Sequence, residues 1–101
     1  MSQFFYVHPD NPQKRLISQA CELIRDGAVV VYPTDSGYAI GCQMEDKKAL
    51  EQLCRIRQID KDHNFTLMCR DMSELSIYAK VDNTAFRLIK NNTPGHYTFV
   101  L

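Results

Sequence analysis

The chain has 101 residues, and twelve Lys and Arg balance twelve Asp and Glu, so its net charge at pH 7 is zero. One domain at most fits this length, and 45% apolar with 24% charged residues is the balance of a globular chain. Neutral composition gives no sign of nucleic-acid binding, so a basic surface would need local placement of Lys and Arg.

Neither a membrane span nor a secretory segment is indicated. No apolar stretch approaches the roughly 20 residues that cross a bilayer, and the first residues lack a basic region followed by a long apolar run. The four cysteines form no Cys-x-x-Cys pair, so we expect buried free thiols. We therefore expect a cytoplasmic protein.

The amino-terminal third predicts strand, helix, strand. Residues 3–7 read as a short strand, and Asn11-Pro12 resembles a helix cap with proline in the first turn. Apolar residues then recur at helical spacing up to Ile24, and Gly27 predicts the stop. The β-branched run 28–32 is typical of a strand buried on both faces, ended by Pro33.

The remainder continues the alternation. Asp46 predicts the cap of a second helix, and residues 65–69 read as the next strand. A short helix opens at residues 73–75, another starts at Asp82, residues 91–95 form a loop by composition, and residues 97–101 read as a final strand. Strands alternating with helices predict the α/β class.

The segment Tyr32-Pro33-Thr34-Asp35-Ser36-Gly37 follows the central predicted strand, where ligand sites of α/β proteins collect. In an extended segment, Thr34 and Ser36 would share one face and could grip a small polar ligand with two hydroxyls. Pro, Asp, Ser and Gly also favour turns. Spacing alone favours the turn interpretation.

Two arginines, Arg55 and Arg57, stand near the end of the second predicted helix. Guanidinium groups there suit phosphate or RNA backbone. They equally suit the negative end of the helix dipole, which is the simpler interpretation.

A polar loop, Lys61-Asp62-His63-Asn64, precedes the strand at 65–69. His63 and Asn64 could contact a base or ribose, although a lone loop histidine is more often simply solvated. The histidines lie far apart in sequence, so we expect no metal site of protein ligands. Any magnesium would arrive bound to ATP phosphates.

The run Val30-Val31-Tyr32-Pro33-Thr34-Asp35-Ser36-Gly37-Tyr38-Ala39-Ile40-Gly41 resembles the Pro-Thr-Asp-Thr-x-Tyr-Gly-Leu-Gly signature of the YrdC/YciO family. The resemblance continues through residues 55–59, 63–71 and 92–101, so it covers essentially the whole chain. The start and the run His63–Cys69 are most similar to the YciO branch.

This resemblance implies a twisted mixed sheet with flanking helices, the YrdC/RibB-like α/β fold. It also implies binding of double-stranded RNA or tRNA, and synthesis of threonylcarbamoyladenylate from threonine, bicarbonate and ATP for tRNA modification. Carried over by position, Thr34, Ser36 and Thr98 would bind substrate. Arg57, His63 and Asn64 would meet the nucleotide, and Arg55 with Arg57 would meet nucleic acid.

Two departures from the family pattern bear on activity. The catalytic branch has Lys-x-Arg where this chain reads Arg57-Gln58-Ile59, so one guanidinium fork becomes an aliphatic side chain. Family domains are also about twice as long, so residues 1–101 resemble the amino-terminal part of a YrdC-like domain. Three functions stay open: a diverged synthase, a non-catalytic RNA- or nucleotide-binding relative, and an inactive fragment.

Overall fold

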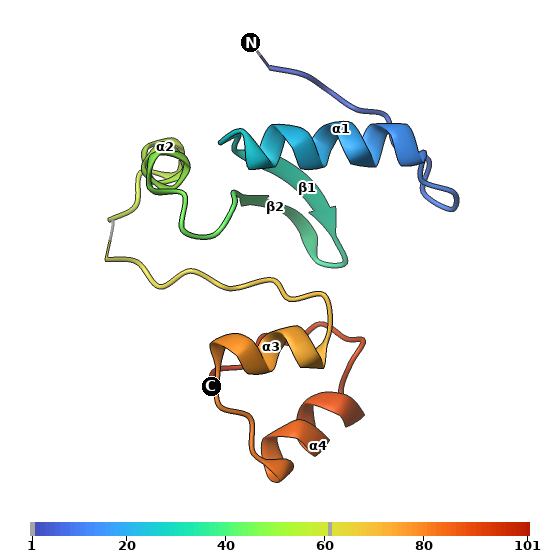
Figure 1. Cartoon of the computed structure of the whole chain (residues 1–101), viewed down its shortest axis with the longest axis vertical. Coiled ribbons are helices and arrows are strands. Elements are labelled where there is room, and N and C mark those ends of the chain that lie inside the picture. Colours follow the sequence, from blue (N-terminus) through green and yellow to red (C-terminus); the bar gives the residue numbers. More distant parts are fainter. Residues whose placement is uncertain (1, 61) are drawn as a thin grey trace. The chain divides into compact units, whose positions relative to one another are not determined.

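The computed structural model describes residues 2–60 and 62–101, and it divides into two compact units, residues 1–63 and 64–101 (Figure 1). Over the described ranges, the first unit holds helices α1 and α2 and the hairpin β1–β2, and the second holds helices α3 and α4. The predicted α/β class is therefore confirmed as a mixed α/β fragment, with four helices and a two-stranded sheet in the described part.

Helix α1 (Lys14–Arg25) begins after the cap predicted at Asn11-Pro12, since its N-cap is Gln13 and no side chain caps it, so that prediction is wrong. The helix ends where the sequence predicts. The backbone N–H of Gly27 donates to the Ile24 carbonyl at 3.1 Å, and that of Ala28 donates to the Leu23 carbonyl at 2.9 Å. This pair of bonds is a Schellman motif, which needs a left-handed residue after the helix. Gly27 supplies it with a φ of +100°.

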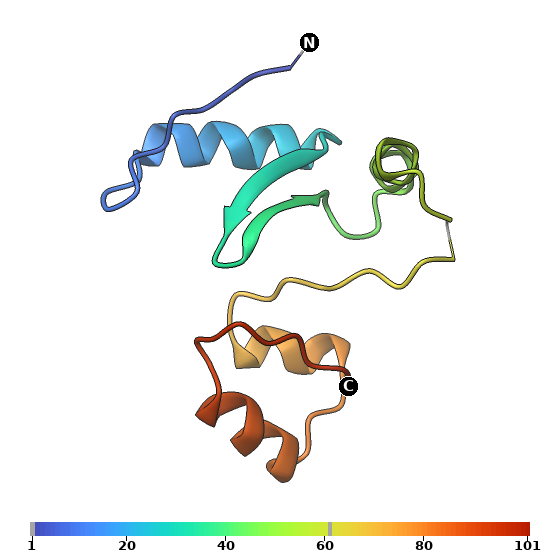
Figure 2. The ribbon, with the colours of Figure 1, turned by 180° about the vertical axis from the view of Figure 1, so that it is seen from behind.

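Strands β1 (Val30–Thr34) and β2 (Gly37–Gly41) form an antiparallel hairpin. The predicted strand at 28–32 is therefore displaced by two residues, and it is neither buried on both faces nor ended by Pro33, which pairs with Tyr38. Proline is tolerated because both strands of a two-stranded sheet are edge strands. The two views place α1 beside this hairpin (Figures 1 and 2).

The two faces of the hairpin differ. On one face the ring of Tyr32 lies over Gly41, where an added Cβ would stand 3.3 Å from a ring carbon. The other face carries Val31, which is 67% exposed, and Tyr38, which is 80% exposed. Glycine at position 41 therefore allows the tyrosine to pack closely on the first face.

Helix α2 (Lys47–Arg57) begins at the predicted cap, since the Asp46 side chain accepts the Ala49 N–H at 3.1 Å. Its inward side supplies the buried residues of the first unit: Ala49, Leu53 and Cys54. Burial of the Cys42 thiol raises its pKa, and the charges of Asp46 and Cys54 add to that effect. All four cysteines are free, as expected, but only Cys54 is buried, and the other three are half-buried.

The second unit consists of α3 (Met72–Tyr78) and α4 (Asn83–Asn91). Asp71 and Asp82 cap these helices by accepting the N–H groups of Glu74 and Ala85, each at 2.8 Å. The sequence predicted both helices and the role of Asp82. Ile89 is the buried apolar residue of this unit over its described length.

Three predicted strands are absent. Residues 3–7, 65–69 and 97–101 all lie in the described ranges, and none of them forms a strand. These predictions are wrong for this chain, because a strand needs a hydrogen-bonded neighbour and the described chain supplies only the pair β1–β2.

In the described residues, no helix is long and apolar enough to cross a membrane.

The cap at Asp46 can be tested by mutation. We expect Asp46→Ala to destabilise α2 by about 1 kcal/mol, because an orphan N–H at the helix start loses its acceptor. Amide hydrogen exchange at Ala49 measures this locally. Asp46→Asn is the matched control and should protect Ala49 as the parent does. Equal losses in both variants would mean that charge rather than capping matters.

A second test concerns pH. The Glu74 N–H bond holds the pKa of Asp71 below its ordinary value of 3.8, with Arg70 contributing further. A lowered pKa in the folded state means that the carboxylate supports α3 fully above the unfolded value and loses this effect as pH falls through the folded value. We expect the Glu74 amide NMR shift to titrate with a midpoint below 3.8.

The control for this titration is Asp71→Asn, which keeps the acceptor but cannot ionise. Its Glu74 amide should show no such transition. A parent midpoint at or above that of an ordinary aspartate would contradict the assignment.

Candidate functional site

The hairpin turn brings two predicted substrate-binding residues together. The Thr34 hydroxyl donates to the Gly37 carbonyl at 2.6 Å, and its oxygen accepts the Ser36 N–H at 3.3 Å. The Ser36 hydroxyl oxygen lies 3.4 Å from that of Thr34. The hydroxyls meet because Asp35 and Ser36 form a two-residue turn, and not because they share the face of an extended strand.

This geometry gives the two hydroxyls different roles. A threonine hydroxyl carries one proton, and that of Thr34 is directed at Gly37. Ser36 therefore has the hydroxyl able to turn its proton toward a ligand. Both residues are exposed. Thr34 therefore helps to build the turn, and Ser36 has the hydroxyl that can donate either to Thr34, 3.4 Å away, or to a ligand.

The end of α2 is a second Schellman motif. The Gln58 N–H donates to the Arg55 carbonyl at 3.3 Å, and the Ile59 N–H donates to the Cys54 carbonyl at 3.1 Å. Gln58 itself is left-handed, with φ 53° and ψ 46°. Glycine is the usual residue at this position, and a side chain there costs on the order of 1 kcal/mol. The chain therefore holds a strained residue inside the segment aligned with Lys-x-Arg.

Arg55 and Arg57 both lie in the last turn of α2, and both are exposed. This placement fits the interpretation that the arginines stabilise the helix carboxyl terminus. Because both side chains are exposed, their guanidinium groups are accessible to a phosphate.

Ile59 has an evident structural role. An apolar residue just after a Schellman turn commonly packs back on the helix it follows. Ile59 is half-buried, and it lines a shallow groove together with Leu50 and Cys54 of α2. The aliphatic side chain therefore takes part in ending the helix.

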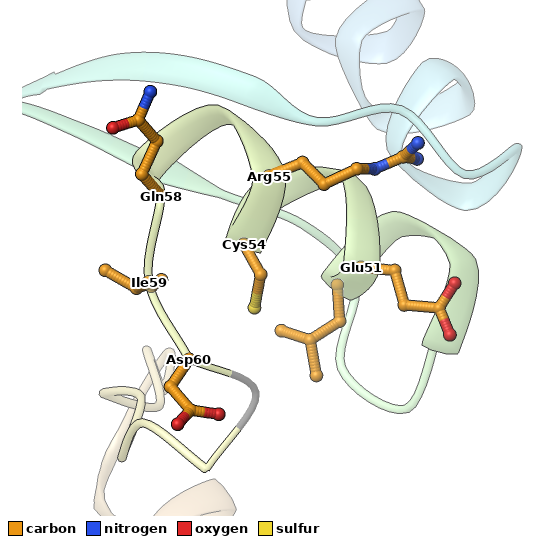
Figure 3. A pocket seen from close by; sticks show the side chains of 7 residues that line it. Glu51, Cys54, Arg55, Gln58, Ile59 and Asp60 are labelled. Carbon is orange, nitrogen blue, oxygen red and sulfur yellow. The ribbon is translucent and has the colours of Figure 1, made fainter.

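The groove at this helix end is mixed in character. Its polar lining comes from Glu51, Arg55, Gln58 and Asp60. Figure 3 shows Cys54 pointing from α2 toward the segment that carries Asp60, while the guanidinium of Arg55 extends away from that segment. With two carboxylates and one guanidinium, the groove has no excess of positive charge for a polyphosphate.

The remaining candidates divide between the units. His63 belongs to the first unit, where its backbone N–H donates to the Asp60 carbonyl at 3.0 Å. Asn64 and Thr98 belong to the second unit, and both are exposed. Lys61, the start of the predicted polar loop, lies outside the described residues.

The loop before Thr98 is tightly built. The side chains of Asn92 and Thr93 donate to the carbonyls of Leu88 and Ile89 at 2.7 and 2.8 Å. A Cβ on Gly95 would lie 2.8 Å from the Asn92 carbonyl oxygen, so only glycine fits there. The loop predicted at 91–95 is confirmed over residues 92–95, whereas Asn91 is the last residue of α4. The glycine of this loop has a steric cause.

The sequence did not indicate the left-handed conformation of Gln58, because glutamine rarely adopts it, unlike glycine or asparagine. One signal was available. An isoleucine two residues beyond the last helical arginine is the apolar position of a Schellman motif. That pattern would have placed the helix end at Arg57 and made Gln58 the left-handed residue.

Comparisons with known proteins agree on one family. The family model Sua5/YciO/YrdC, described as "Telomere recombination", matches residues 22–101. YciO of Escherichia coli K12, an uncharacterized protein, is 72% identical over 101 residues, which are 100% of this chain and 49% of YciO. An uncharacterized Haemophilus influenzae protein is 65% identical over the same shares.

A more distant relative has a named activity. The threonylcarbamoyl-AMP synthase of Vibrio vulnificus YJ016 is 27% identical over 88 residues, which are 84% of this chain and 47% of that protein. The crystal structure of E. coli YciO matches with a TM-score of 0.85 at 73% identity. That match covers 94% of this chain and 46% of the crystallised one.

The chain thus spans about half the length of the curated relatives it matches. The family model covers well over half of the chain, and the identity to YciO far exceeds the identity to the synthase. The hydroxyl-bearing hairpin and the helix that ends at Arg57 both fall within the matched residues. The chain therefore belongs to the Sua5/YciO/YrdC family, as a relative of YciO.

Proposed function

We propose that this chain is part of a YrdC-like domain that binds nucleotide and double-stranded RNA or tRNA, and that forms L-threonylcarbamoyladenylate. The substrates would be threonine, bicarbonate and the magnesium complex of ATP. The observation that carries the proposal is the pair of hydroxyls at the hairpin turn, 3.4 Å apart. The relationship to the V. vulnificus threonylcarbamoyl-AMP synthase supports it.

The proposed reaction needs no covalent bond between the protein and a substrate. The threonine amine and bicarbonate give a carbamate and a molecule of water. The carboxylate of the carbamate then attacks the α-phosphate of ATP and releases pyrophosphate. The protein would position the reactants and neutralise charge. Ser36 would donate a hydrogen bond to the threonine substrate, with Thr34 holding the turn. Arg57 and His63 of the first unit would contact the nucleotide. Thr98 and Asn64, in the second unit, keep the substrate and nucleotide roles that the family resemblance implies.

A second candidate is a relative that binds RNA or nucleotide without the chemistry. The observation in its favour is Ile59, which lines the groove at the end of α2 in the place aligned with a family arginine. Losing one anion-stabilising donor costs on the order of a hundredfold in rate in other enzymes. The two candidates share the binding surface of Arg55 and Arg57 and differ in turnover.

The synthase proposal predicts pyrophosphate release that requires both ATP and threonine. In the Ser36→Ala variant, we expect the KM for threonine to rise about tenfold, because one hydrogen bond to the ligand is lost. Coupled pyrophosphate detection at varied threonine concentration measures this. Since the Thr34–Gly37 bond does not involve the Ser36 side chain, the turn itself should persist.

The control is Thr34→Val, which removes the turn bond and should lower the melting temperature, whereas Ser36→Ala should not. Pyrophosphate release that is the same without threonine would end the synthase proposal. Absence of release together with RNA binding would favour the second candidate.

RNA binding by the end of α2 predicts a specific salt dependence. Each phosphate contact releases counterions, so Arg55→Gln and Arg57→Gln should each reduce the slope of log affinity against log salt by about one. Fluorescence anisotropy with a double-stranded RNA at several KCl concentrations measures the slope.

The matched control is Lys47→Gln, since Lys47 lies in the first turn of the same helix and far along it from the arginines. Its slope should equal that of the parent. If all three variants behave alike, the interaction is a general charge effect, and no measurable binding at low salt would remove RNA from the proposed function.

A further inference from the structure

The loop between the amino-terminal segment and α1 is built around the side chain of His8. The ring nitrogen Nδ1 accepts the backbone N–H of Asn11 at 3.0 Å and that of Asp10 at 3.2 Å. The backbone N–H of His8 itself donates to Oε1 of Gln13 at 3.0 Å. Figures 1 and 2 show the chain reversing its direction in this loop, at the amino-terminal end of α1. The imidazole therefore holds the reversal closed.

These hydrogen bonds specify the protonation state of the ring. A neutral imidazole has one nitrogen that accepts hydrogen bonds, whereas both nitrogens of the protonated ring donate. Because Nδ1 accepts the N–H groups of Asp10 and Asn11, the closed loop requires a neutral His8 with its proton on Nε2. Protonation puts a hydrogen on Nδ1 and removes both bonds in one step.

Gln13 connects this loop to the helix. It is the N-cap residue of α1, yet its side chain accepts no N–H of the helix and instead accepts the N–H of His8. The first turn of α1 begins with Lys14 and Arg15 and holds no acidic residue. A positive charge on His8 would join these two charges at the positive end of the helix dipole. Protonation therefore adds charge repulsion to the loss of the two hydrogen bonds.

The neighbouring charged groups titrate in other ranges. Asp10 is the one other titratable side chain of residues 8–13, and aspartate ordinarily ionises near pH 4. Lysine and arginine, as at positions 14 and 15, keep their charge below about pH 9. The ion pair Arg70–Asp71 of the described residues belongs to the second unit. Histidine ordinarily changes its charge between about pH 5 and 8, so a transition of this loop in that range reports on His8.

We propose that His8 is a pH-sensitive switch, which closes the loop before α1 when its ring is neutral and opens the loop when its ring is protonated. Above the titration range of histidine, both bonds to Nδ1 are present. As the pH falls through that range, the bonds are lost and residues 2–7 separate from the start of α1. The switch uses residues 8–13 alone, so it is independent of synthase activity and of RNA binding.

NMR spectroscopy of the 101-residue chain between about pH 8 and about pH 5 tests this switch. We expect the amide resonances of Asp10 and Asn11 to shift with the same midpoint as the ring of His8. The nitrogen chemical shifts of that ring at high pH should place its proton on Nε2. The heteronuclear nuclear Overhauser effects of Phe4 and Tyr6 should fall through the same transition, because a released segment moves on a faster timescale.

Two substitutions of His8 separate its hydrogen bonds from its charge. His8→Ala removes the acceptor, so its Asp10 and Asn11 resonances at high pH should resemble those of the acid form of the parent. His8→Asn is the matched control, because an asparagine side chain can accept a backbone N–H two residues on and does not ionise. Its loop should stay closed throughout the titration.

A second control concerns the choice of histidine. His96→Gln removes a histidine of the second unit, and it should leave the transition of Asp10 and Asn11 unchanged.

Three results would overturn the proposal. The first is constant Asp10 and Asn11 resonances while the His8 ring titrates. The second is a transition in His8→Asn equal to that of the parent. The third is a nuclear Overhauser effect at Phe4 and Tyr6 that does not change, since the loop would then stay closed when His8 is charged.

Discussion

The carboxylate of Asp46 stands between the end of α1 and the start of α2. One oxygen accepts the Ala49 N–H, and the other is the atom nearest to the place that a Cβ on Gly27 would take, 3.4 Å away. Ala49 is only 1% exposed. Helix α2 supplies all the buried apolar residues described in the first unit. The position at which this helix begins therefore determines which residues form the core of the unit.

Helix ends could be predicted from sequence far better than strands could. The stop at Gly27 and the caps at Asp46 and Asp82 depend on residues within a few positions of each other, and all three are present. A helix also satisfies its hydrogen bonds within its own segment. The segments 3–7, 65–69 and 97–101 carry strand-like residues, yet a strand depends on a neighbour that local sequence does not specify.

In the hairpin, too, local sequence predicted that a strand is present but not how that strand pairs. The β-branched run at 28–32 predicted a strand buried on both faces and ended by Pro33, whereas the strand continues to Thr34 and turns at Asp35-Ser36 into an antiparallel hairpin. The candidate residues Thr34 and Ser36 were found by type, and their closeness was correct, but the reason for it was not. Arg55 and Arg57 were found as a pair at a helix end. The sequence pattern did not reveal that Gln58 adopts a left-handed conformation between that helix and Ile59.

The candidate residues lie on a hydrogen-bonded turn and on a strained helix end. The Thr34 hydroxyl donates to the Gly37 carbonyl and so helps to close the turn, and the Ser36 hydroxyl oxygen lies 3.4 Å from that of Thr34. At the end of α2, Ile59 follows the left-handed Gln58 and lines the groove beside Cys54. Each feature is therefore built from residues close together in the sequence.

The length of the hairpin turn fixes which side chains share a face. Side chains in a strand alternate between faces, so a single inserted or deleted residue between Thr34 and Gly37 would shift the register and move the side chains of one strand to the opposite face of its partner. Tyr32 would then leave its place over Gly41. The number of residues in this turn, rather than their type, therefore sets which residues of β2 lie beside Tyr32.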